Sequence, residues 1–272
     1  MPALGRIDRT SKLRIEEVEL RFERRGASPV VALDRVSLEV ADKEFAVIVG
    51  PSGCGKSSLL LLVAGLHRPS SGRMLLEGRT IDEPGRDRGM VFQSYTLFPW
   101  LTVRDNVAFG LRLRSVPPAQ RKSTVDRYLT EVGLEGFADA YPRQLSGGMM
   151  QRVALARAMA NDPEILLMDE PFGALDSQTR SVMQQLLLHV WAHEHKTVLF
   201  VTHDIDEALL LGDRVYVMTA RPGRIKECLE VQLPRPRPVE MTMSPEFLAL
   251  KHRVLALLQE EVTRSIGLGR MD

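Results

Sequence analysis

A glycine-rich segment in the first quarter of the chain carries residue types that bind phosphate. It reads Gly50-Pro51-Ser52-Gly53-Cys54-Gly55-Lys56-Ser57 and fits the pattern G-x-x-x-x-G-K-[ST]. Glycines let backbone N–H groups turn toward an anion, and a helix beginning there adds partial positive charge. The Lys56 ammonium can reach the β- and γ-phosphates, and the Ser57 hydroxyl can bind Mg²⁺. The segment therefore predicts binding of a nucleoside triphosphate.

The segments on either side of this loop have the sequence that the motif requires. Residues 45–49 are apolar and mostly β-branched, which predicts a buried strand, and the leucine-rich stretch 58–65 predicts a helix. A glycine-rich turn ahead of a helix can also be only a turn. The fixed eight-residue pattern between a strand and a helix disfavours that alternative.

Two acidic residues end a second apolar segment. The run ILLMDE predicts a buried strand that ends at Asp169 and Glu170. Ligands collect at the carboxyl ends of strands in an open parallel sheet, so we expect both acids to face the nucleotide. Two further predicted strands end in the polar residues Gln93 and His203.

The remaining pattern alternates between strands and helices. Strands are expected at 13–22, 36–40, 45–49, 73–76, 89–93, 165–170, 197–202, 213–219 and 225–231. Helices are expected at 58–65, 103–113, 119–132, 149–159, 176–195, 204–211 and about 245–262. The alternation predicts an α/β fold with a mostly parallel sheet and helices on both faces. Short antiparallel strands ahead of the phosphate loop and a helical insertion at about 94–160 complete the expected architecture.

Composition and charge restrict the class of protein. Of 272 residues, 36 are Lys or Arg and 35 are Asp or Glu, so the net charge of +1 gives nucleic-acid binding no electrostatic support. The longest apolar run, 59–66, is far shorter than the ~20 residues of a membrane-spanning helix. We therefore expect a soluble chain that only a partner holds at a membrane. Residues 1–12 are polar and are expected to form a flexible segment without a signal peptide.

A third motif indicates the family that the sequence resembles. Leu145-Ser146-Gly147-Gly148 precedes a predicted helix, and Ala174-Leu175-Asp176 follows the acidic strand. Together with the phosphate loop, the acidic pair and the two polar strand ends, in this order, they resemble the ATP-binding subunits of ABC transporters. The resemblance covers about residues 13–230, and its most specific part is Leu-Ser-Gly-Gly, which other P-loop enzymes lack. It implies a P-loop NTPase of the ABC cassette type over residues 13–232, with an antiparallel β subdomain.

The resemblance implies a role for each matching residue. The nucleotide-binding residues would be Phe22, Gly50, Pro51, Ser52, Gly53, Cys54, Gly55, Lys56, Ser57 and Ser58. The ligands of Mg²⁺ would be Ser57, Gln93 and Asp169. Glu170 would orient or deprotonate the attacking water, His203 would contact the γ-phosphate, and Gln93 would sense the metal and the water.

The same resemblance implies that two subunits act together. Ser146, Gly147 and Gly148 would bind the γ-phosphate of ATP held by the other subunit, and Asp176 would link the two sites. The Leu-Ser-Gly-Gly stretch suits this role because it is a second helix N-terminus that offers N–H groups to phosphate. Phosphoryl transfer to water needs positioning and charge neutralisation more than covalent chemistry. The chain is thus expected to be an ATPase that dimerises around two ATP.

Several short segments look like the nitrate, sulfonate and taurine uptake group within the family: 98–103, 106–110, 221–225 and 233–236. This resemblance implies an ATP-hydrolysing subunit that drives import of a small anion through integral membrane permease subunits. It also implies a homodimer, an extracytoplasmic substrate-binding protein and a peripheral location at the cytoplasmic face of the inner (plasma) membrane. The alternatives are an ABC ATPase for lipid trafficking or export, and a soluble ABC ATPase without a transport role.

Some residues admit two interpretations from the sequence alone. Cys54, at a helix N-terminus, is either a reactive thiol of lowered pKa or a small residue tolerated in a tight loop. Phe22, by its strand position alone, is favoured as a core residue, whereas the resemblance implies that it stacks on adenine. The aromatic loop 95–100 is either a docking surface for a membrane subunit or part of the chain's own helical insertion.

The C-terminal region, residues 233–272, is expected to be a proline-containing connector followed by a helix. The connector is expected to be extended, with Arg235 and Arg237 serving solubility. The helix packs either on its own domain or on a partner. Upstream, His189, His193 and His195 include a pair at helical spacing, but no carboxylate or cysteine cluster completes a metal site, so a solvated helix face is favoured.

Overall fold

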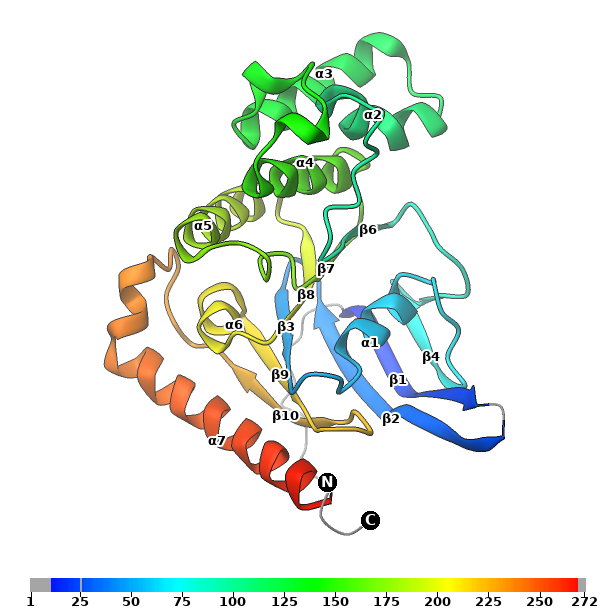
Figure 1. Ribbon diagram of the computed structural model, residues 1–272, viewed down its shortest axis with the longest axis vertical. Coiled ribbons are helices and arrows are strands. Elements are labelled where there is room, and N and C mark those ends of the chain that lie inside the picture. The colour runs from blue at the N-terminus through cyan, green and yellow to red at the C-terminus, as the bar shows by residue number, and fades with distance from the viewer. Residues whose placement is uncertain (1–10, 25, 269–272) are drawn as a thin grey trace.

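A six-stranded sheet forms the centre of the described chain, which comprises residues 11–24 and 26–268 of a computed structural model (Figure 1). Its strand order is β10-β9-β3-β8-β7-β6, and neighbouring strands are parallel except for the antiparallel pair β9 and β10. The strands are β3 (Phe45–Val49), β6 (Arg88–Val91), β7 (Ile165–Asp169), β8 (Thr197–Thr202), β9 (Arg214–Met218) and β10 (Ile225–Glu230). The expected mostly parallel sheet is confirmed.

A second sheet is antiparallel and has the order β2-β1-β4-β5. Its strands are β1 (Ser11–Arg24), β2 (Ala27–Ala41), β4 (Ser71–Leu76) and β5 (Arg79–Thr80). A strand was expected here only at 36–40, but pairing with β1 extends β2 back to Ala27, and Phe22 lies opposite Val30. The first two residues of β1 fall within the expected flexible segment, whose residues 1–10 lie outside the described residues.

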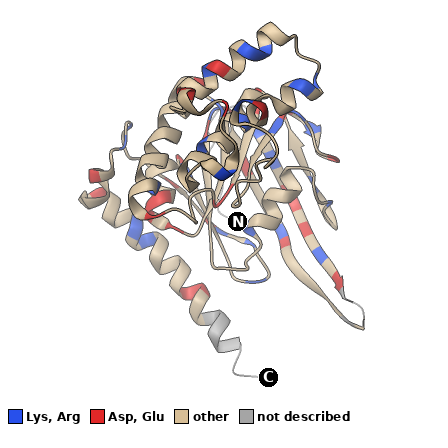
Figure 2. Cartoon of the chain, turned by 45° about the horizontal axis from the view of Figure 1, so that its top comes forward, with Lys and Arg blue, Asp and Glu red and all other residues tan. Residues whose placement is uncertain are grey.

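Oppositely charged residues are interspersed along the long strands of this second sheet (Figure 2). Arg14 Nε lies 3.0 Å from Glu39 Oε1 across the β1–β2 pair, and Arg73 Nε donates to Glu16 Oε2 at 2.6 Å from β4. Exposed pairs of this kind stabilise a fold only weakly. The register of the hairpin therefore depends mainly on its inward-facing residues, such as the buried Leu13.

Helices cover both faces of the central sheet. Helix α1 (Lys56–Val63) lies on the face toward the second sheet, and α5 (Ser177–Glu194) and α6 (Ile205–Leu211) lie on the other face (Figure 1). Alternate residues of β3 enter the two cores, because side chains of a strand point to opposite faces. Phe45 and Val47 pack with α5 and α6, whereas Ala46 and Ile48 pack with α1 and the second sheet.

The expected helical insertion is present at one end of the molecule, beyond β6 and β7 (Figure 1). It contains α2 (Val103–Leu113), α3 (Pro118–Glu131) and α4 (Gly147–Ala160), with the short 3₁₀ turns η1 (Glu135–Phe137) and η2 (Pro142–Gln144). Helix α4 is buried along most of its length, which joins the insertion to the central sheet. No helix of the described residues is both long enough and apolar enough to cross a membrane.

The C-terminal helix packs on its own chain. It comprises α7 (Pro245–Leu268), preceded by the 3₁₀ turn η3 (Val239–Met243), and it buries Phe247 and Val254. Lys251 Nζ lies 2.7 Å from Asp206 Oδ1 on α6. Of the two positions that the sequence left open for this helix, the structure therefore has the one on its own domain.

Arg237 corrects the interpretation of the connector as a solubilising linker. Its guanidinium is almost fully buried and donates hydrogen bonds to four main-chain carbonyls at 2.6–3.1 Å: those of Leu209, Gly212, Val231 and Leu233. Two of these carbonyls belong to the end of α6, where a cation is favoured by the helix dipole. Burial lowers the pKa of Arg237 to about 10, which leaves the side chain charged at neutral pH. The arginine thus anchors the connector to the domain.

Arg235 is also held in place. Its Nη2 donates to Asp213 Oδ1 at 2.7 Å, and its guanidinium lies over the ring of Trp191, 4.3 Å from the centroid. The sequence predicted a solvated linker. In the structure both arginines attach the connector to the domain, because main-chain carbonyls and a carboxylate accept their hydrogen bonds.

Candidate nucleotide-binding site

The phosphate loop joins the end of β3 to the start of α1. Gly53 and Gly55 have φ angles of +74° and +102°, a region that L side chains rarely adopt. A Cβ at Gly55 would also lie 2.7 Å from the Leu33 side chain. Within the loop, Lys56 Nζ donates to the carbonyls of Gly50 at 2.9 Å and Pro51 at 3.2 Å. The loop therefore curls around the buried lysine and places its ammonium at the floor of a pocket.

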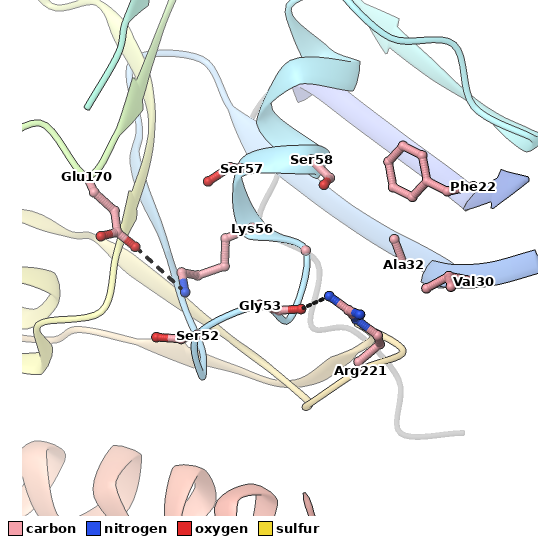
Figure 3. Close-up of a pocket in the computed structure, with 11 residues that line it drawn as sticks. Phe22, Val30, Ala32, Ser52, Gly53, Lys56, Ser57, Ser58, Glu170 and Arg221 are labelled. Carbon is pink, nitrogen blue, oxygen red and sulfur yellow. Dashed lines mark hydrogen bonds and ion pairs between the residues drawn. The ribbon is translucent and has the colours of Figure 1, made fainter. Parts of the chain in front are cut away.

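That pocket is open and has a volume of about 520 Å³ (Figure 3). Eight of its lining residues were expected at the site: Phe22, Ser52, Gly53, Gly55, Lys56, Ser57, Ser58 and Glu170. Three were missed: Val30, Ala32 and Arg221. Val30 and Ala32 lie in β2 ahead of the strand expected at 36–40, and no local motif marks them. Arg221 was noted only within a segment typical of a subgroup.

Some expected residues do not line this pocket. Gly50, Pro51 and Cys54 belong to the phosphate loop but are not among the lining residues of the pocket, and a Cβ on Gly50 would lie 2.8 Å from the buried Cys54 Sγ. Asp169, His203 and Gln93 lie beside the pocket at the strand ends. The Leu-Ser-Gly-Gly segment and Asp176 lie in the helical part of the molecule.

Carboxylates from the end of β7 face the phosphate loop, as their position at a strand end predicts. Ser57 Oγ donates to Asp169 Oδ1 at 2.9 Å, and Lys56 Nζ lies 3.8 Å from Glu170 Oε1. The other oxygen of Glu170 is 2.8 Å from His203 Nδ1, which follows the neighbouring strand β8. Glu170 therefore lies between a cation of the loop and an imidazole, a position suited to holding a water molecule beside a phosphate.

The Ser57–Asp169 pair fits a magnesium ion. Mg²⁺ takes oxygen ligands and is held in nucleotide sites by one or two carboxylates together with phosphate oxygens. The hydroxyl of Ser57 and the carboxylate of Asp169 are already adjacent. Burial raises the pKa of Asp169, although the charge of Lys56 acts in the opposite direction. Gln93 lies near the turn that follows Glu170, since a Cβ on Gly173 would be 3.9 Å from both Gln93 Nε2 and Glu170 Cβ.

The histidines of α5 remain on a helix surface. His189 and His193 stack with ring centroids 4.3 Å apart, and His193 Nδ1 lies 2.8 Å from the His189 carbonyl. Across the described ranges, no group of three or more His, Cys, Asp or Glu residues could hold a metal ion. His189 and His193 are both exposed on α5.

Two helix N-termini meet at the Leu-Ser-Gly-Gly segment. Ser146 caps α4 by accepting from the Met149 N–H at 3.3 Å, and Asp176 caps α5 by accepting from the Thr179 N–H at 3.0 Å. The helices approach so closely that a Cβ on Gly148 would lie 2.7 Å from Thr179 Cγ2. The backbone N–H of Thr179 holds the pKa of Asp176 below its usual range. This pair of N-termini is suited to an anion but lies apart from the pocket of its own chain.

Phe22 does not belong to the core. It lies near the end of β1, its exposed fraction is 43%, and its ring forms one wall of the pocket (Figure 3). The interpretation from strand position alone was therefore wrong, because β1 extends past the core at this point. An exposed ring at the wall of a nucleotide pocket is suited to stacking on a base.

The aromatic loop 95–100 packs in part on the chain's own helical insertion and is in part exposed. Phe98 packs on Phe109 of α2, with ring centroids 4.4 Å apart, whereas Trp100 is 71% exposed. Arg157 of α4 donates to the Thr96 carbonyl at 2.7 Å, and the Asn106 amide donates to the carbonyl of Phe98 at 3.2 Å. The loop is thus fixed on the helical insertion and presents Trp100 to the surroundings.

Cys54 is expected to react slowly with alkylating agents. The residue is 1% exposed, and burial raises the pKa of its thiol even though Lys56 acts in the opposite direction. The reactive-thiolate interpretation is therefore wrong, because a raised pKa reduces the thiolate fraction at neutral pH. The other cysteine of the chain, Cys228, is replaced by serine so that only Cys54 reacts. In this Cys228→Ser variant, maleimide labelling of the folded protein at pH 7 should be at least about 10-fold slower than after unfolding. Equal rates in the folded and unfolded protein would contradict the burial.

Comparisons with known proteins agree with this geometry. The family model described as ABC transporter matches residues 33–173. An uncharacterized ABC transporter ATP-binding protein of Methanocaldococcus jannaschii is 54% identical over 255 residues, which cover 94% of each chain. The nitrate import ATP-binding protein NrtD of Synechocystis is 47% identical over 240 residues, covering 86% of this chain and 90% of NrtD. A solved dimeric ATP-binding cassette, MJ0796, with bound ADP and Pi, has a TM-score of 0.72 at 34% identity, covering 82% of this chain and all of that one.

Proposed function

Because the chain belongs to the ABC transporter family of ATP-binding proteins, we propose that it is the ATP-hydrolysing subunit of an importer for a small anion. Nitrate, sulfonate or taurine are the proposed cargoes. The observation that carries the proposal is the convergence of the phosphate loop with the carboxylates of Asp169 and Glu170 at one edge of the sheet. The similarity to the nitrate import protein NrtD extends along most of the chain, and it supports import as the direction of transport and a small anion as the cargo.

In the proposed mechanism, the phosphate loop holds the triphosphate through its N–H groups and Lys56. Ser57, Asp169 and Gln93 would hold Mg²⁺, which would supply neutralisation of phosphate charge. Glu170 accepts a hydrogen bond from the attacking water and orients it toward the γ-phosphate. His203, which contacts Glu170 at 2.8 Å, fixes that carboxylate and approaches the γ-phosphate. Charge stabilisation and positioning thus supply the catalysis.

The proposed active species is a homodimer. Ser146, Gly147 and Gly148 offer a helix N-terminus that lies apart from the pocket of its own chain, so it can serve ATP held by a second copy. Asp176, at the adjoining N-terminus of α5, would link the two sites. Because each γ-phosphate would then join two chains, ATP favours the dimer and hydrolysis releases it.

The aromatic loop is the proposed contact with an integral membrane permease. Trp100 is exposed on a loop that begins two residues after Gln93, so the loop can respond to events at the γ-phosphate. A large exposed aromatic on a fixed loop is typical of a protein contact. A permease partner would hold the chain at the cytoplasmic face of the inner membrane, and an extracytoplasmic binding protein would deliver the anion.

A gentle tagged purification from native membranes tests the transport function. We expect a multi-span membrane protein to co-purify with the wild-type chain, and less of it with Trp100→Ala, which removes the exposed ring. The matched control is Phe137→Ala, which removes another exposed aromatic, on η1. Recovery of soluble partners alone, from intact membranes, would overturn the transport function and favour a soluble ABC ATPase. Co-purification of lipid-trafficking or export components would favour that alternative instead.

A further inference from the structure

The loop between β9 and β10 forms a wall of the nucleotide pocket and is fixed to the second sheet. Gly223 N–H donates to the Ala32 carbonyl at 2.9 Å, and the Gly223 carbonyl accepts from the Asp34 N–H at 3.0 Å. Arg224 Nε donates to Asp34 Oδ2 at 3.0 Å. A Cβ on Gly223 would lie 2.1 Å from the Cys54 carbonyl, so the loop lies directly against the phosphate loop. These contacts hold residues 219–224 in one position.

The C-terminal helix α7 holds the same loop from the other side. The Glu261 carboxylate accepts from the Ala220 N–H at 3.2 Å, and its second oxygen lies 2.8 Å from Lys226 Nζ. Glu261 is buried, which excludes water from this contact. The backbone on both sides of Arg221 is therefore constrained before any ligand binds.

The Arg221 side chain itself is available to a ligand. It is exposed, and its Nη2 donates to the Gly53 carbonyl at 3.4 Å, which is long for a hydrogen bond. Within the described ranges, no carboxylate oxygen lies within 4.0 Å of its guanidinium. Most of its five N–H donors are thus not engaged by strong protein acceptors.

The position of Arg221 points to one part of the nucleotide. Figure 3 shows Glu170 and Lys56 on one side of the pocket and Phe22 on the other, with Arg221 beside Gly53 and below Val30 and Ala32. Among the described lining residues, Lys56 and Arg221 carry positive charge and Glu170 carries negative charge. A nucleotide with its outer phosphates at Lys56 and its base at Phe22 would have its innermost phosphate between these residues, in the part of the pocket lined by Arg221.

We propose that Arg221 is a second nucleotide-binding cation, which contacts the phosphate nearest the ribose. The inference rests on the proposed function of this pocket as the ATP site. A guanidinium is suited to the contact because it donates several hydrogen bonds to phosphate and remains charged at all physiological pH values. Its contact does not involve the γ-phosphate, so it serves ADP as well as ATP.

Titration calorimetry with ADP tests this inference without hydrolysis. We expect Arg221→Gln to raise the Kd for ADP about 10-fold and Arg221→Lys to raise it about threefold. Lysine keeps the positive charge but lacks the paired N–H donors of the guanidinium. The affinity of wild type should also fall more steeply with salt than that of Arg221→Gln. Arg86→Gln is the matched control, since it removes an exposed arginine outside the pocket lining, and its Kd should stay within about twofold of wild type.

Two results would overturn the assignment of Arg221. One is a Kd for Arg221→Gln within twofold of wild type. The other is equal weakening in Arg221→Lys and Arg221→Gln with an unchanged salt dependence, which indicates stacking on the base and no phosphate contact. Lys56→Ala separates this inference from the function on which it rests. If Lys56→Ala loses ADP binding and Arg221→Gln does not, the pocket is still the nucleotide site and only the role of Arg221 is refuted. If both variants bind ADP like wild type, the pocket is not the nucleotide site.

Discussion

Glu170→Gln is expected to reduce ATP hydrolysis at least about 100-fold while leaving ATP binding intact. The amide keeps the shape of the carboxylate but loses its charge and its ability to accept a proton from water. Glu170 contacts His203 at 2.8 Å and lies 3.8 Å from Lys56, so a neutral side chain also changes the field at the γ-phosphate. Phosphate release at saturating Mg-ATP measures the effect.

The same variant is expected to accumulate as an ATP-bound dimer. If ATP joins two copies and only hydrolysis releases them, a slow variant stays associated, and size-exclusion chromatography with Mg-ATP should show twice the monomer mass. With ADP the variant should elute as a monomer. Glu135→Gln, which changes an exposed glutamate on η1, is the control and should hydrolyse ATP like wild type. Near-normal hydrolysis by Glu170→Gln, or a monomer at saturating Mg-ATP, would refute this assignment.

Arg237→Ala is expected to destabilise the fold by about 3 kcal/mol or more. Truncation leaves a cavity and removes the donors that pair with the carbonyls of Leu209, Gly212, Val231 and Leu233. These carbonyls are then desolvated without partners, which costs more than the net value of the hydrogen bonds. The connector should loosen together with α7, because both depend on this anchor.

Thermal unfolding followed by circular dichroism measures this effect. For a domain of this size, a loss of that magnitude lowers the midpoint by about 6–12 °C. Arg143→Ala is the matched control, because it removes an exposed arginine of η2 and should change stability by less than about 0.5 kcal/mol. A midpoint for Arg237→Ala equal to that of Arg143→Ala would show that the buried guanidinium does not hold the connector.

Elements with strong local patterns could be predicted from the sequence to the residue. The strands Phe45–Val49 and Thr197–Thr202 and the helix Val103–Leu113 have the expected bounds. Each is a short apolar or amphipathic run bounded by residues that end it, such as the glycine of the phosphate loop. Element type in these cases depends on periodicity within a few residues, which a single sequence contains.

Elements completed by long-range pairing were predicted less well. The first half of β2 was not expected as a strand, and in the structure it pairs with β1. The same hairpin brings Val30 and Ala32 to the pocket, so these two lining residues were not predicted from the sequence. Strand formation here depends on a partner strand rather than on local propensity.

The sequence by itself determined the chemistry of this protein: a phosphate loop, two adjacent carboxylates at a strand end, and a second helix N-terminus suited to phosphate. Each of these features is a contiguous motif, so its residue types and spacing can be recognised without a structure. Only the tertiary structure decided burial and neighbours, such as the thiol of Cys54 under the loop and the guanidinium of Arg237 among carbonyls. Arg221 reaches Gly53 across 168 residues of chain, and Ser57 reaches Asp169 across 112. Such contacts depend on how distant segments pack, and local sequence does not encode that packing in a readable pattern.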